Sequence, residues 1–114
     1  MNNNQKKAAE YIRSLLKEKM VPRNQVASLS GLSNAYIRHL EQGNIANVNR
    51  AKLIAFAVAL SLDLQSVDHL LTIFDRTKLT SEDIPLFLEN AGQRKISAAM
   101  LPLHAWYTYE LHVM

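Results

Sequence analysis

One side of a predicted helix near the middle of the chain groups residues with recognition chemistry: Asn34, Ala35, Arg38 and His39. Helical positions three and four apart share a face, so these four point the same way. The amide of Asn34 can bond bidentately to an adenine edge, and the guanidinium of Arg38 to a guanine edge. A methyl such as that of Ala35 can touch a thymine methyl. The alternative is that some of these side chains only face solvent.

The elements that must position this face are predicted by the order of residues around it: Val26-Ala27, Gly31, Ser33, Ile37, Leu40 and Gly43. A small residue such as Ala27 lets two helices cross closely, and Gly31 allows the left-handed backbone that ends a helix. Ser33 is a good N-cap for the next helix, which Gly43 ends. This order predicts a helix-turn-helix, whose second helix usually lies in the DNA major groove.

The same stretch resembles the Cro and repressor type of helix-turn-helix, also called the XRE family. The matching residues are Val26-Ala27, Gly31-Leu32-Ser33, Tyr36-Ile37, Leu40-Glu41, Gly43, the run 53–60, Val67 and Leu70-Leu71. The resemblance covers roughly residues 6–71. The chain departs from the family pattern at Pro22, where a capping Ser is common, at Arg23, where Gln is common, and over 46–49. It implies a five-helix DNA-binding bundle and a transcriptional regulator.

The resemblance also implies roles for single side chains. Positions that read bases in the family correspond here to Asn34, Ala35, Arg38 and His39. Positions that hold phosphates in the family correspond to Arg23 and Gln42. Tyr36, Asn44 and Asn47 are further candidates for contacts with the DNA backbone. For Tyr36 the alternative is that its ring covers the core. An acid beside a polyanion is unfavourable, so we expect Glu41 to bond within the domain.

Charge is distributed unevenly along the 114 residues. Residues 1–60 hold nine Lys or Arg and three acids, whereas residues 61–114 hold four and seven. The net charge is therefore +6 in the first part and −3 in the second. A polyanion would attract the first part and repel the second. Alone, this gradient also fits two ordinary solvated surfaces; together with the motif it favours double-stranded DNA as partner.

Several other classes of function find no support in the sequence. There is no cysteine, which excludes disulfides and Cys-based zinc sites. The four histidines lack metal-ligand spacing, and no nucleophile–base pair or phosphate loop appears, so we expect neither enzyme activity nor a cofactor. The longest apolar run, 53–62, is half the roughly 20 residues that a membrane span needs. The polar start is not a signal peptide, so a cytoplasmic location is expected.

Helical periodicity predicts a mainly α fold with helices over 6–18, 23–30, 34–42, 50–60 and a fifth capped by Asp63. We divide the chain into a DNA-binding domain, 1–75, and a C-terminal extension, 76–114. The extension begins with a sixth helix that has Thr80 as cap, Asp83 in the third position and an end near Ala91.

The tail of the extension alternates apolar and polar residues from Trp106 onward. This period of two predicts a short β-strand, and a helix after Pro102 is the alternative. We expect the tail to form a homodimer interface through Trp106, Tyr107, Tyr109, Leu111 and Val113, aided by Leu86, Phe87 and Leu88. The alternative is that it folds back over its own bundle.

The sequence thus predicts a DNA-binding transcriptional regulator, such as a repressor, acting as a homodimer on a two-fold operator. An antitoxin or phage regulator whose tail binds a partner protein is one alternative. A helical protein-interaction module that does not bind DNA is another. None of these requires a membrane.

Overall fold

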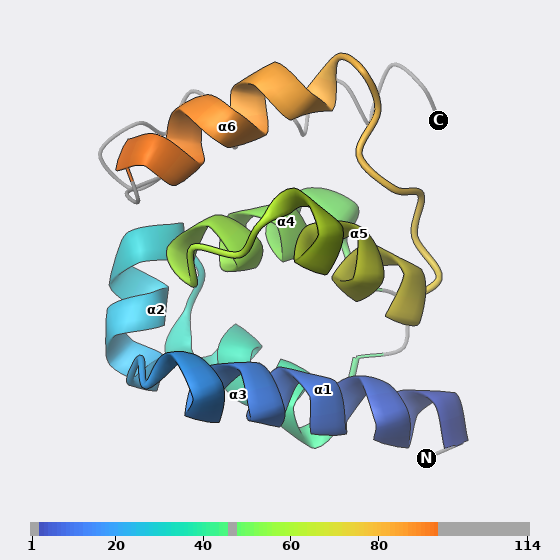
Figure 1. Cartoon of the computed structure of the whole chain (residues 1–114). Coiled ribbons are helices and arrows are strands. Elements are labelled where there is room, and N and C mark those ends of the chain that lie inside the picture. Colours follow the sequence, from blue (N-terminus) through green and yellow to red (C-terminus); the bar gives the residue numbers. More distant parts are fainter. Residues whose placement is uncertain (1–2, 46–47, 94–114) are drawn as a thin grey trace.

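A computed structural model describes the backbone of residues 3–45 and 48–93 and the side chains of these residues up to 89. All regular elements in this part of the chain are helices (Figure 1). They are α1 (Asn3–Lys19), α2 (Arg23–Ser30), α3 (Asn34–Gln42), α4 (Arg50–Ala59), α5 (Leu64–Ile73) and α6 (Asp83–Gln93). The predicted mainly α, repressor-like bundle is confirmed, with α6 as its sixth helix.

Three helices begin at a residue whose side chain accepts a hydrogen bond from a backbone N–H of the first turn. These N-caps are Ser33 for α3, Asn49 for α4 and Asp63 for α5. Such caps satisfy donors that have no partner inside the helix. Helix α2 instead follows Pro22, which forms no side-chain cap. Local sequence therefore fixes the starts of α3, α4 and α5.

The two helices of the helix-turn-helix both end at a glycine in the left-handed region. Gly31 has φ of 79° and its N–H donates to the carbonyl of Ala27, while Gly43 has φ of 72°. A Cβ placed on Gly31 would meet nothing within 4 Å. The requirement for glycine there is therefore conformational rather than steric.

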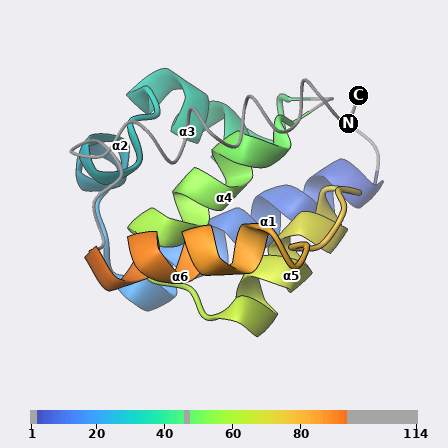
Figure 2. The same cartoon turned by 90° about the horizontal axis from the view of Figure 1, so that it is seen from above.

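Helix α4 is the centre of the bundle. Every residue from Leu53 to Leu60 is fully buried. Helices α2, α5 and α6 all pack against α4, and α1 closes the bundle against α3 and α5. Figure 1 shows α4 and α5 between α6 on one side and α1 and α3 on the other, and Figure 2 shows α3 displaced to one side of α6. The core thus lies around α4, and α3 is left at the periphery.

Helix α6 belongs to this core. Phe87 is only 1% exposed and joins the same buried cluster as Phe56. The expectation that Phe87 adds spare apolar surface is therefore wrong: the helix turns its aromatic ring inward, against α4, and leaves Leu88 exposed. The predicted capping pair is confirmed, since Thr80 and Asp83 exchange side-chain to backbone hydrogen bonds. The helix continues past Gly92 to Gln93.

The predicted tail lies outside the described residues. This applies to Trp106, Tyr107, Tyr109, Leu111 and Val113, and also to Asn47 in the connection between α3 and α4. The choice between a strand and a helix for the tail, and its role in dimerisation, therefore stay predictions.

Candidate nucleic-acid interface

Helix α3 presents its four predicted base-reading residues on one exposed side. Asn34, Ala35, Arg38 and His39 are all exposed, whereas Ile37 and Leu40 of the same helix are buried. The predicted register is thus confirmed, because the two inward positions anchor the helix and turn its polar side outward. Contact with bases is not tested by this geometry and stays a prediction for all four residues.

An ion pair between Arg23 and Glu41 joins α2 to α3. Glu41, near the end of α3, accepts a hydrogen bond from Nε of Arg23 at 2.8 Å and forms an ion pair with its Nη2, also at 2.8 Å. Arg13 of α1 donates to the backbone carbonyl of Glu41. The predicted structural role of Glu41 is confirmed. Arg23 stays exposed, with 44% of its side chain accessible, so a phosphate contact remains a prediction.

Two further residues predicted to hold phosphates lie beside each other. Asn44 donates from Nδ2 to Oε1 of Gln42 at 2.9 Å, and both side chains are exposed. This bond leaves the amide nitrogen of Gln42 and the amide oxygen of Asn44 outside the mutual contact. The pair therefore keeps a donor, the Gln42 amide, for a phosphate at the end of α3.

Tyr36 packs against the core, which is the alternative in which its ring covers apolar side chains. A phosphate contact by its hydroxyl stays a prediction. The ammonium group of Lys52 lies over the ring of Tyr36, with Nζ 4.6 Å from the ring centroid. A cation held over an aromatic face gains about 0.5–1 kcal/mol at an exposed site. Sequence reasoning missed Lys52. The available signal was its place in the first turn of the helix that follows the predicted recognition helix.

Ion pairing reduces the basic surface that the sequence suggests. The charge of Arg23 is paired with Glu41, and that of Arg50 is paired with Asp83 at 2.7 Å. Arg38 has no ion pair within the described part of the chain and is exposed. The attraction for a polyanion next to α3 therefore depends on the cations without an ion pair there, Arg38, Lys52 and Arg13, more than on the summed charge.

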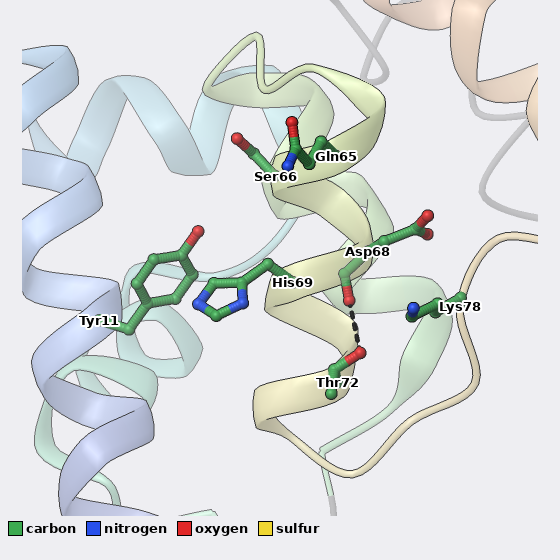
Figure 3. Close-up of a pocket in the computed structure, with 7 residues that line it drawn as sticks. All are labelled: Tyr11, Gln65, Ser66, Asp68, His69, Thr72 and Lys78. Carbon is green, nitrogen blue, oxygen red and sulfur yellow. Dashed lines mark hydrogen bonds between the residues drawn. The ribbon is translucent and has the colours of Figure 1, made fainter.

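A pocket of about 520 Å³ lies between α1, α5 and the segment before α6 (Figure 3). Its lining is Tyr11, Gln65, Ser66, Asp68, His69, Thr72 and Lys78. The rings of Tyr11 and His69 meet edge to face, with centroids 4.9 Å apart. Burial, with a smaller contribution from Glu18, raises the pKa of Tyr11 above 10.0. The pocket shares no residue with the exposed side of α3.

The comparison with protein families agrees with this geometry. A helix-turn-helix family model matches residues 12–67, from Ile12 in the middle of α1 to Val67 in the first turn of α5. Residues 12–67 are a Cro/repressor-type helix-turn-helix domain. Neither a curated protein nor a solved structure matches the chain. The domain supports DNA binding and transcription regulation in general terms.

Other features of this helix-turn-helix protein bear on alternative functions. Families of this type regulate by binding DNA and are typically not enzymes. In the described ranges, no three His, Asp or Glu side chains gather as a metal site would require. Over the same residues, no helix combines the length and apolar character needed to cross a membrane.

Proposed function

We propose that the chain is a sequence-specific, DNA-binding transcriptional regulator that places α3 in the major groove. The observation that supports this most directly is the common exposure of Asn34, Ala35, Arg38 and His39 on a helix whose ends are fixed by Ser33 and Gly43. An amide, a methyl and a guanidinium on one face are the groups that distinguish base pairs in that groove.

Phosphate contacts would fix the register of α3 on the duplex. The candidates lie around α3: Arg23 at the start of α2, Gln42 as the last residue of α3, Asn44 after it, and Lys52 in the first turn of α4. The Gln42–Asn44 pair gives an amide donor, and Arg23 and Lys52 give donors that also carry charge. Their positions around α3 favour an arrangement in which the surrounding elements hold the backbone while α3 reads the bases.

We propose a two-fold dimer because α3 alone is too short to read a long DNA site. Helix α3 has nine residues and is about 13 Å long, so one copy reaches only a few base pairs. Two copies on half-sites about 34 Å apart would double the sequence that is read. Among described residues, the large exposed hydrophobic side chains are Met20 and Leu88. We therefore assign the dimer interface to the tail beyond the described residues.

The test is selection of bound sites from random-sequence duplex DNA, followed by shift assays on the selected and a scrambled duplex at two salt concentrations. A specific regulator should enrich a motif with two-fold symmetry and prefer the selected site by at least about 10³-fold. Enrichment of no motif, with equally weak binding to both duplexes, would refute sequence-specific recognition.

One alternative has an observation in its favour. Pairing of Arg23 and Arg50 with acids leaves a smaller free basic surface than the sequence suggests. A helical protein-interaction module without DNA binding would fit that reduction, and it predicts no shift even at low salt. An antitoxin or phage regulator would bind DNA in the same assay and differ only by a partner protein on its tail.

A further inference from the structure

Arg50 stands at the meeting point of three segments. It is the first residue of α4, and its side chain reaches across to the connection between α5 and α6. Nε donates to the carbonyl of Thr77 at 2.8 Å, and Nη2 donates to the carbonyl of Lys78 at 2.8 Å and to Oδ2 of Asp83 at 2.7 Å. Only 11% of this side chain is exposed, so its hydrogen-bonding capacity is spent on these partners rather than on water.

Asp83 completes the arrangement from the other side. Its side chain is 2% exposed, and the same Oδ2 that pairs with Arg50 also accepts from the N–H of Thr80 at 2.9 Å. One carboxylate oxygen thus caps α6 and binds the start of α4. A buried charge of this kind is tolerated because its partner carries the opposite charge and hydrogen bonds are made.

Arg76 ties the same two segments together in the opposite direction. It follows α5, and its Nε donates to the carbonyl of Val48 at 2.8 Å. Val48 lies in the connection from α3 to α4 and is itself 2% exposed. Arg50 therefore extends from the start of α4 to the α5–α6 connection, and Arg76 extends back from that connection to the residues before α4.

At the first position of α4, the positive charge of Arg50 would destabilise the helix if it had no partners. A cation in the first turn of a helix opposes the positive end of the helix dipole. The negative charge of Asp83 offsets this repulsion and is itself favourably placed in the first turn of α6. Helix α4 therefore begins with an unfavourable cation, at the point where the connection from α3 enters α4.

We propose that Arg50, Arg76 and Asp83, which we call the arginine clamp, are positioning residues for DNA binding. The clamp fixes the end of the α3–α4 connection and the first turn of α4, and it thereby orients Lys52 beside Tyr36 of α3. None of the three contacts DNA. The inference rests on the proposed function and deepens it, since it makes the connection 76–82 and α6 part of the DNA-binding unit and not a separate extension.

The decisive variant is Arg76→Met, because it removes the bond to Val48 without leaving a buried charge unpaired. Its matched control is Lys78→Met, which removes the same charge from the same connection. The contact that Lys78 makes with Arg50 uses its backbone carbonyl and survives the substitution. Both full-length variants are titrated on random-sequence duplex DNA over a range of salt concentrations, well below their unfolding temperatures.

We expect Arg76→Met to bind about tenfold more weakly than Lys78→Met, because one phosphate contact is lost from a displaced first turn of α4. The slope of log affinity against log salt should fall by about one in Arg76→Met relative to the control. A purely stabilising clamp would lower the melting temperature of Arg76→Met and leave both the affinity and the slope of the folded protein equal to those of Lys78→Met.

A second variant addresses the buried pair. Asp83→Asn keeps the shape of the side chain and a group that can cap Thr80, but removes the charge that holds Arg50. It should show the same lower salt slope as Arg76→Met. Equal slopes for wild type, Arg76→Met and Asp83→Asn would overturn the clamp while leaving DNA binding intact. Absence of binding by the wild type would instead refute the proposed function.

Discussion

The guanidinium of Arg23 contacts the carboxylate of Glu41 through two nitrogens, each 2.8 Å from Oε2. The contact joins the first residue of α2 to the penultimate residue of α3, so the two helices of the motif are tied where they are farthest apart in the sequence. It also places a negative charge beside a cation that is expected to meet a phosphate. The pair therefore sets the helix angle and lowers the attraction for DNA at once.

Glu41→Gln should strengthen binding to all DNA sequences and steepen the dependence on salt by up to about one phosphate equivalent, since Arg23 is then unpaired. The stability loss should stay within about 1 kcal/mol, as is usual for an exposed ion pair. Arg23→Ala is the matched variant and should weaken binding to all sequences. Weaker binding by Glu41→Gln, equal to that of Arg23→Ala, would show that the pair acts on helix position alone.

Asn34→Ala should cost about 1–3 kcal/mol on the preferred site and relax selection at one base position. The reason is that an exposed amide at the start of α3 can bond bidentately to an adenine. Site selection with the variant measures both effects. Gln65→Ala, which removes an exposed amide from α5, serves as control and should change neither. A uniform loss on all sequences in Asn34→Ala would assign that residue to the backbone.

Phe56→Ala should lower the free energy of unfolding by roughly 3–5 kcal/mol, because it empties a fully buried position in the central helix. That is a large share of the stability of a domain of this size. Chemical denaturation monitored by circular dichroism measures it. Leu88→Ala is the control and should change stability by less than about 0.5 kcal/mol, since that side chain is 52% exposed. A similar loss in both variants would contradict the burial described for α4.

Asp63 should make the bundle sensitive to acid. Its carboxylate caps α5 by accepting from the N–H of Ser66 at 2.7 Å, and hydrogen bonds from Ser66 hold its pKa below 3.8. The folded state therefore favours the charged form, and the stabilisation is present above pH 3.8 and lost as pH falls through the lower folded pKa.

The measurement is the thermal midpoint of wild type, Asp63→Ala and Asp63→Asn across the acid range. Asp63→Ala should melt below wild type at neutral pH, and the difference should shrink on acidification. Asp63→Asn keeps a capping oxygen and should show a weaker pH dependence than wild type. A gap between Asp63→Ala and wild type that stays constant with pH would rule out the charged cap.

Local signals explain which helix bounds were predictable. The bounds of α2 and α3 agree with the prediction because Gly31, Ser33 and Gly43 act through their own backbone or side chain. Helix α1 begins at Asn3, before the expected Lys6, since residues 3–5 are polar and carry no apolar period. Helix α4 ends at Ala59, one residue early, because Leu60 forms its C-cap.

Contacts between distant residues explain what the sequence did not reveal. Composition alone counts Arg50 and Arg76 as surface charge, whereas their partners lie 27–33 residues away and leave no periodic pattern in the sequence. The expectation of spare apolar surface at Phe87 is wrong because helical periodicity shows that one side of a helix is apolar without showing what covers it. For the interface, the exposed side of α3 followed from spacing, whereas Lys52 required knowledge of how α4 lies beside Tyr36.

Complete burial of α4 has a consequence for how the chain must be made. Its residues 53–60 are apolar on every side and are covered by α2, α5 and α6. During synthesis α2 emerges before α4, but α5 and α6 follow it. Until about 30 further residues have left the ribosome, this stretch has no cover on two of its sides. The nascent chain is then at its most prone to aggregate, and translation pauses before α6 would prolong that interval.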